Sequence, residues 1–146
     1  MRFITNHRNI ITEVIACLFI GLFMYAAMSK IIDFAEFKAQ LGLSPILTPF
    51  SRTLAWVIPA LEILLSLLLS LTRTRYLALA GSFGLMVLFS MYIFAITHFS
   101  DHVPCSCGGI LQQMSWGQHL VFNLVFAAIG LTGILLSDQE HKLLLQ

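Results

Sequence analysis

Four apolar runs, each about as long as a membrane is thick, constrain this sequence more than any other feature. A bilayer core of about 30 Å needs roughly 20 mostly apolar residues for one helical crossing. The runs cover approximately residues 10–32, 54–71, 76–98 and 116–136. The segments between them contain the charges, prolines and glycines that interrupt apolar helices. The sequence therefore predicts an all-α integral membrane protein, with residues 1–146 forming a single domain built as a bundle of four transmembrane helices.

The composition supports lipid as the main solvent of this chain. Hydrophobic residues make up 58% of the sequence and charged residues only 10%, which is too little charge for the polar coat of a soluble domain. The net charge is +1, and the eight Lys and Arg residues are scattered between the apolar runs. Because phosphate binding needs clustered cations, this pattern excludes a nucleic-acid partner.

The first run has a second interpretation, because Arg2 and Arg8 precede it as they would precede a signal peptide. The run is longer than an ordinary signal core, and it lacks a clean cleavage site of small residues. We therefore expect a membrane span that is retained.

The distribution of Lys and Arg predicts the orientation, since these residues are in excess on the cytoplasmic side of membrane proteins. One side of the predicted bundle would hold Arg2, Arg8, Arg73, Arg75 and Lys142. The other side would hold Lys30, Lys38 and Arg52, diluted by Asp33 and Glu36. Both termini are therefore expected in the cytoplasm. The loop at 99–115 is then expected to face the periplasm, with the chain in a bacterial inner membrane.

That loop contains the densest group of reactive side chains, the thiols of Cys105 and Cys107 with His98 and His102 close by. Two thiols one residue apart close a small, strained disulfide ring, which is easily reduced and suits exchange. A nearby imidazole, including that of His119, favours the reactive thiolate. These five residues are the predicted catalytic set. A structural disulfide that tightens the loop remains the alternative.

Zinc binding is a further interpretation of the same loop, since Cys105, Cys107, His98 and His102 would supply four nitrogen and sulfur ligands. Structural zinc sites place two or more residues between paired cysteines, and here only Ser106 intervenes. No metal site is therefore predicted.

Glu62 is the second unusual feature, because it lies in the middle of an apolar run. An ionised carboxylate there is costly unless it is paired or hydrated. Counted at 1.5 Å per residue from the outer surface, Glu62 lies roughly 12 Å deep and Asn123 roughly 10 Å deep. Lys30 could reach inward along its flexible stem. Three interpretations stay open: a hydrogen-bonded packing carboxyl, a contact for a quinone or other substrate, and a proton relay. Lys30, Glu62 and Asn123 are the predicted cofactor-binding residues, with a quinone as the candidate cofactor.

The remaining features have structural interpretations. We expect Cys17 to be a buried, inert thiol. The aromatic and methionine side chains of the third run fit packing and lipid contact; they are Phe83, Met86, Phe89, Met91, Tyr92 and Phe94. Small residues permit close helix approach, and the candidates are Gly21, Ala26, Ala27, Gly81, Gly84 and Gly130.

Taken together, three segments resemble MauE/DoxX-type redox-associated membrane proteins, and specifically the MauE branch. They are Met28-Ser29-Lys30-Ile31-Ile32-Asp33-Phe34, Ile58-Pro59-Ala60-Leu61-Glu62 and Cys105-Ser106-Cys107-Gly108. The resemblance implies a four-helix bundle in the inner membrane and a role in the thiol and disulfide chemistry of exported proteins. The architecture is also similar to that of quinone-coupled four-helix enzymes such as vitamin K epoxide reductase. Those enzymes use a Cys-x-x-Cys pair and a second pair, whereas this chain has one close pair, so a partner or a quinone would have to complete the electron path.

We therefore predict a redox-associated membrane protein that supports thiol–disulfide exchange or maturation of exported proteins. Its expected partner is a periplasmic thioredoxin-like or cysteine-containing protein. As an enzyme it would be a thiol–disulfide or quinone-linked oxidoreductase. The alternative is a noncatalytic subunit or assembly factor of a membrane complex, with a structural disulfide in the loop. A small transporter ranks last, because Glu62 is its sole support.

Overall fold

The structure is a computed structural model that describes residues 2–44, 47–99 and 115–144. In chain order the elements are α1 (Arg2–Ile32), α2 (Phe34–Leu43), the short 3-10 helix η1 (Thr48–Phe50), α3 (Ser51–Ser70), α4 (Arg75–Phe99) and α5 (Trp116–Leu144). The described residues contain helices and no strands. The prediction of an all-α protein is confirmed.

Four segments of these helices are long and apolar enough to cross a membrane. They are Asn9–Ile32, Thr48–Ser70, Arg75–Phe99 and Trp116–Ser137. With a rise of about 1.5 Å per residue, each is longer than the hydrocarbon core of a bilayer is thick. The predicted membrane bundle is therefore confirmed, and the chain is a multi-pass membrane protein.

The segment between the first two predicted spans, residues 10–32 and 54–71, contains the additional helix α2. Helical hydrogen bonding continues past Asp33, whose carbonyl accepts from the Phe37 amide at 2.9 Å. Ten residues are too few to span a membrane, so the search for long apolar runs could not reveal α2. The helix is stabilised by packing, because Phe37 and Leu41 bury their side chains against Ala55 of α3.

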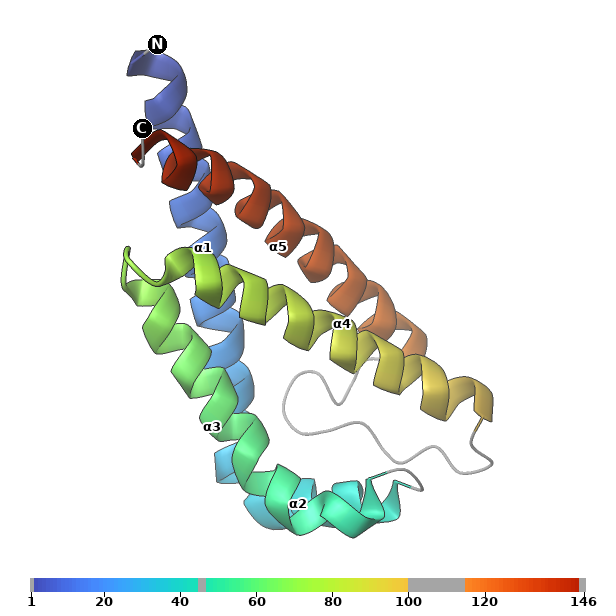
Figure 1. The fold of residues 1–146 in the computed structure, drawn as a ribbon. Helices are drawn as coiled ribbons and strands as arrows, with labels where there is room; N and C mark the ends of the chain where they lie inside the picture. Colours follow the sequence, from blue (N-terminus) through green and yellow to red (C-terminus); the bar gives the residue numbers. More distant parts are fainter. Residues whose placement is uncertain (1, 45–46, 100–114, 145–146) are drawn as a thin grey trace.

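The four long helices form two closely packed pairs. The most extensive contacts join α1 to α3 and α4 to α5. Both termini lie at one end of the bundle, and α2 lies at the other end (Figure 1). From the turn at residues 71–74, α3 and α4 diverge toward the end that holds α2 (Figure 1).

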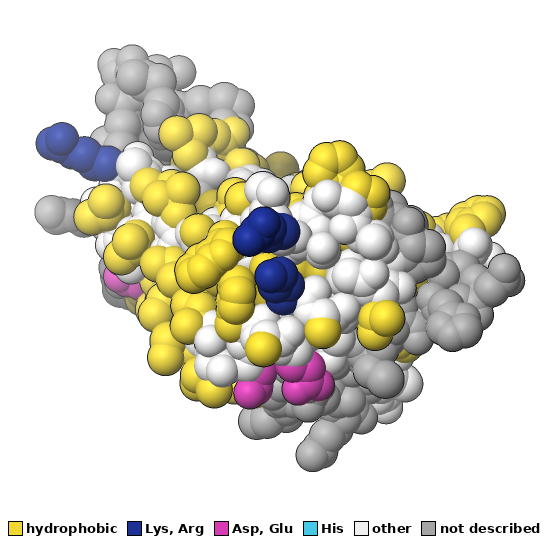
Figure 2. Space-filling view, turned by 90° about the horizontal axis from the view of Figure 1, so that it is seen from below, with side chains coloured by type: hydrophobic (Ala, Val, Ile, Leu, Met, Phe, Trp, Pro, Cys, Tyr) yellow, Lys and Arg dark blue, Asp and Glu magenta, His cyan; other side chains and the backbone are white. Residues whose placement is uncertain are grey.

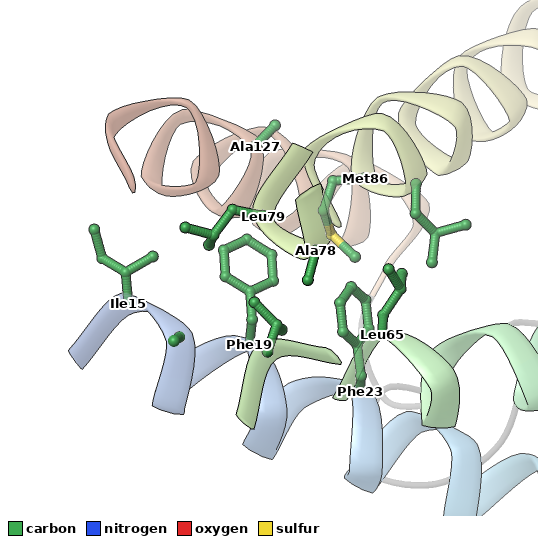
Figure 3. Packing of buried hydrophobic residues seen from close by; sticks show 11 residues of the cluster. Ile15, Phe19, Phe23, Leu65, Ala78, Leu79, Met86 and Ala127 are labelled. Carbon is green, nitrogen blue, oxygen red and sulfur yellow. The ribbon is translucent and has the colours of Figure 1, made fainter. Parts of the chain in front are cut away.

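The core lies where the two pairs meet, at the closed side of this divergence (Figure 3). Phe19 and Phe23 of α1 are fully buried among Leu65 of α3, Leu79 of α4 and neighbouring side chains. The Phe19 ring also stacks edge to face on Phe126 of α5, with 5.5 Å between centroids. Aromatic side chains from the first and last spans thus bring the two pairs together.

Of the glycines predicted to allow close helix packing, Gly81 and Gly130 lie against a neighbouring helix, and Gly21 and Gly84 do not. A Cβ added at Gly81 would lie 2.9 Å from Leu65 Cδ2, and one added at Gly130 would lie 3.2 Å from Phe19 Cζ. Nothing lies within 4 Å of such an atom at Gly21 or Gly84. The prediction is therefore wrong for Gly21 and Gly84, because the faces that carry them meet no neighbouring helix.

The outer surface of the spans is mostly apolar, as expected where helices contact lipid. Cys17 lies on this surface, and the prediction of a buried thiol is wrong. Residues 16 and 19 of the same helix are buried, so the neighbouring position 17 points away from the core. At the α2 end a few acidic and basic side chains lie among apolar ones (Figure 2). Asp33, Glu36, Lys38 and Arg52 are the exposed charged residues of this part of the chain.

Candidate functional site

A buried ion pair joins α1 to α3 inside the membrane-spanning part of the bundle. Lys30 Nζ lies 2.8 Å from Glu62 Oε1, and the Glu62 side chain is 1% exposed. The ammonium also donates to the Ala26 carbonyl at 3.3 Å, and it lies 5.8 Å from the centroid of the Phe37 ring. Lys30 lies in the last turn of α1. Its aliphatic side chain extends back toward the start of the helix and places the ammonium group deeper in the bundle. The pairing reduces the cost of placing both charges in an apolar environment.

A cavity of about 410 Å³ lies beside this ion pair, between the two helix pairs. All five α-helices contribute to its wall. The apolar part of the wall includes Leu22 and Phe23 of α1, Phe37 and Leu41 of α2, Leu54 and Ile58 of α3, Met86 and Phe89 of α4, and Trp116 and Phe122 of α5. A mostly apolar cavity with a few polar groups is typical of small-molecule sites.

Four of the predicted site residues meet at this cavity, and we call them the polar cluster: Lys30, Glu62, His119 and Asn123. Asn123 is 3% exposed and lies one helical turn after His119 on α5. The two side chains therefore occupy the same face of α5. The sequence predicted that Glu62 and Asn123 reach similar depths, and they do line one cavity.

The polar cluster contains three buried atoms without a hydrogen-bond partner among the described residues: Glu62 Oε2, Asn123 Nδ2 and His119 Nδ1. Glu62 therefore bonds to Lys30 and makes no bond to the Asn123 amide. An unsatisfied polar group inside a membrane costs free energy, because no water replaces the missing partner. The cluster thus holds one free acceptor, one free donor and one imidazole nitrogen beside the cavity.

His98 does not belong to the polar cluster. It lies at the end of α4, is exposed, and does not line the cavity. Its ring stacks on Phe94 with 4.2 Å between centroids, and Nδ1 lies 3.1 Å from the Phe94 carbonyl oxygen. The structure therefore separates His98 from His119, which the sequence analysis had grouped together.

The other predicted catalytic residues, Cys105, Cys107 and His102, lie outside the described residues. The same holds for three of the four ligands of the zinc interpretation. Within the described ranges, no three His, Cys, Asp or Glu side chains gather closely enough to hold a metal ion.

Sequence reasoning missed the part that α2 and α4 play in the cavity. Met86, Phe89 and Tyr92 were assigned to packing and lipid contact, yet all three line the cavity. Tyr92 also donates to Ser44 Oγ at 2.9 Å, which connects α4 to the residue that follows α2. The spacing of these residues indicates a common helix face. Hydropathy alone could not show that this face borders a cavity, because the whole of α4 is apolar.

Comparison with protein families identifies a match over most of the chain. A family model described as methylamine utilisation protein MauE matches residues 8–136. The match covers the first three membrane-spanning segments completely and the fourth up to its last residue, Ser137. No curated protein and no solved structure matches the chain. The DoxX part of the resemblance stays a prediction.

Proposed function

The chain belongs to the MauE family, and from this premise we propose that it is an inner-membrane protein that supports thiol–disulfide exchange in exported proteins. In this proposal residues 1–146 form one transmembrane domain with both termini in the cytoplasm. Cys105 and Cys107 face the periplasm and exchange with a thioredoxin-like or other cysteine-containing partner. The thiol role goes beyond the family's description, which names methylamine utilisation.

The observation that supports this proposal is the position of the polar cluster. The cluster and its cavity lie toward the end of the bundle at which α4 ends and α5 begins. Trp116, the first residue of α5, lines the cavity and follows Cys107 by nine residues in the sequence. A membrane bundle whose buried polar groups lie near the attachment points of a dithiol loop is suited to chemistry at the membrane surface.

The proposed exchange balances without an additional reagent. The thiolate of one loop cysteine attacks a client disulfide, a mixed disulfide forms, and one client sulfur leaves as a thiol. The second loop cysteine then attacks the mixed disulfide, which releases the client dithiol and leaves Cys105 joined to Cys107. Reversing these steps oxidises the client and reduces the loop. The relative reduction potentials of the two pairs determine the direction.

Mass-tag labelling of membranes tests whether the loop pair changes redox state. After treatment with diamide or with a phosphine reductant, a maleimide mass tag counts the free thiols of the denatured chain. We expect the tag count to change by two between the treatments, and Cys105→Ser with Cys107→Ser to abolish the change. Cys17→Ser is the matched control, because this thiol lies on the lipid-facing surface of α1 and should leave the change intact.

Trapping distinguishes exchange from a purely structural disulfide. A single Cys105→Ser or Cys107→Ser variant retains one loop thiol, which should accumulate a mixed disulfide with its client on a nonreducing gel. If the pair stays oxidised under every treatment and neither variant traps a client, exchange is refuted. Loss of partner copurification in the double variant would then favour the noncatalytic subunit or assembly factor.

A further inference from the structure

The cavity reaches the lipid-facing surface of the bundle between α3 and α4. Val57 and Leu61 of α3 and Leu88 of α4 line the cavity, yet their exposed fractions are 46%, 37% and 64%. All three belong to membrane-spanning segments, so the surface that they expose contacts lipid. We call Val57, Leu61 and Leu88 the portal.

A portal toward lipid selects ligands by solubility. The portal consists of three apolar side chains within membrane-spanning segments, so a molecule that enters through it has to partition into the bilayer first. The cavity volume of about 410 Å³ lies within the range of ordinary small-molecule sites. A lipid-soluble molecule with a compact head therefore fits better than a water-soluble metabolite.

The charge of the polar cluster selects a neutral head group. Lys30 and Glu62 compensate each other at 2.8 Å, so the cluster offers no spare positive charge to a carboxylate or phosphate. A fatty acid or phospholipid head would bring an uncompensated charge into the cavity, which is costly at this depth. A neutral ligand avoids that cost.

The three unpartnered atoms define the hydrogen bonds that this ligand would make. Asn123 Nδ2 is a donor for a carbonyl or hydroxyl oxygen, and Glu62 Oε2 is an acceptor for a hydroxyl. His119 Nδ1 donates or accepts according to its tautomer. The aromatic rings of Phe89, Phe122 and Trp116 belong to the same wall, and such rings pack favourably on a flat ring.

From these four observations we propose that the cavity binds a neutral, lipid-soluble ring compound of the quinone and quinol class, which enters from the bilayer through the portal. A ring oxygen accepts from Asn123 Nδ2, and His119 bonds to a ring oxygen in the tautomer that suits it. In the quinol, a ring hydroxyl also donates to Glu62 Oε2. The apolar tail leaves between α3 and α4. This binding does not rest on the proposed thiol exchange, since every residue that supports it belongs to the described helices.

Tryptophan fluorescence of the purified protein in nanodiscs tests the proposal, with decylubiquinone and its quinol as the probes. The sequence has two tryptophans; Trp116 lines the cavity, whereas Trp56 is 69% exposed and does not. In the Trp56→Phe variant, all tryptophan fluorescence therefore comes from Trp116 at the cavity. We expect saturable quenching of Trp116 fluorescence, beyond the linear quenching that partition of the probe into lipid produces.

Two kinds of variant test the binding mode. Asn123→Leu removes a hydrogen-bond donor at similar volume and should weaken probe binding roughly tenfold. Val57→Phe with Leu88→Phe narrows the portal and should slow association severalfold in stopped-flow traces. Leu64→Phe is the matched control, since Leu64 is exposed on α3 and does not line the cavity. The portal and control substitutions lie on the lipid-facing surface, so they spare the core.

The outcomes separate the alternatives. Quenching that is linear in probe concentration, or an association rate that is equal in the wild type and the portal variant, overturns the proposal. Displacement of the probe by oleate or phosphatidylglycerol at matched concentration also overturns it, because it would show a site for anionic lipid. Saturable binding in the Cys105→Ser, Cys107→Ser variant supports the proposal even where the exchange of thiols fails.

Discussion

Lys30 near the end of α1 and Glu62 in the middle of α3 form an ion pair inside the bundle, with 2.8 Å between Nζ and Oε1. The two residues are 32 positions apart in the sequence, so the contact depends on the packing of α1 against α3. One oxygen of the carboxylate is bonded, and the other borders the cavity without a partner. Glu62 thus takes part both in the packing of α1 against α3 and in the wall of the candidate site.

Removal of one partner of this pair should destabilise the protein strongly. Lys30→Met leaves the Glu62 carboxylate buried without its counterion, which costs about 3–5 kcal/mol of unfolding free energy. Lys30→Met with Glu62→Met should recover most of that loss, because an apolar pair needs no compensation. Unfolding by a denaturing detergent in mixed micelles measures the stability of the wild type and of both variants.

The pair of Glu13 and Arg75, in which the Glu13 carboxylate is exposed, is the control for that experiment. Its atoms lie 3.9 Å apart, and the Glu13 side chain is 66% exposed. Glu13→Gln should change stability by less than about 1 kcal/mol. If Lys30→Met costs no more than Glu13→Gln, then Glu62 is a neutral packing residue and the ion pair contributes nothing.

Gly130 should tolerate no added methyl group. A Cβ there would lie 3.2 Å from Phe19 Cζ, and Phe19 is fully buried between Phe23 and Phe126, so it has little room to move. Gly130→Ala should therefore lose about 1–3 kcal/mol through overpacking. Thermal unfolding in detergent measures the loss.

Gly84→Ala is the matched substitution for Gly130→Ala, since nothing lies within 4 Å of its new Cβ. It should be neutral or stabilising by up to about 1 kcal/mol, because alanine favours the helix. Equal destabilisation at Gly84 and Gly130 would show that helix contact at Gly130 is not the cause.

The hydrogen bond from Tyr92 to Ser44 should couple α4 to the end of α2. It is 2.9 Å long, and Ser44 is fully buried. Tyr92→Phe and Ser44→Ala should each cost about 0.5–1.5 kcal/mol, and the double variant should cost less than their sum. Hydrogen exchange of the α2 amides would reveal the loosening. Strict additivity in this double-mutant cycle would mean that the two side chains do not interact.

The proposed orientation can be tested with introduced cysteines in a background of Cys17→Ser, Cys105→Ser and Cys107→Ser. Lys38→Cys on α2 and Thr72→Cys at the turn before α4 are both exposed positions, at opposite ends of the bundle. In intact cells, a membrane-impermeant maleimide should label Lys38→Cys and should label Thr72→Cys only after permeabilisation. The reverse pattern would place both termini outside the cytoplasm.

Local sequence was sufficient for the membrane spans and for the chemical character of the candidate site. Run length and hydropathy are local properties, so residues 10–32 and 76–98 could be identified as spans without any knowledge of packing. Glu62 stood out for the same reason, since a carboxylate within an apolar run is conspicuous.

Only the tertiary structure decided which side chains meet. The partner of Glu62, the exposure of Cys17 and the cavity face of Met86 and Phe89 depend on how each helix is rotated about its axis. In a membrane bundle the lipid-facing and core-facing sides of a helix are both apolar, so periodicity carries little information about that rotation. The sequence therefore determined that this chain crosses a membrane with a costly polar group inside it. Packing between distant helices determined that this group is paired and borders a cavity open to lipid.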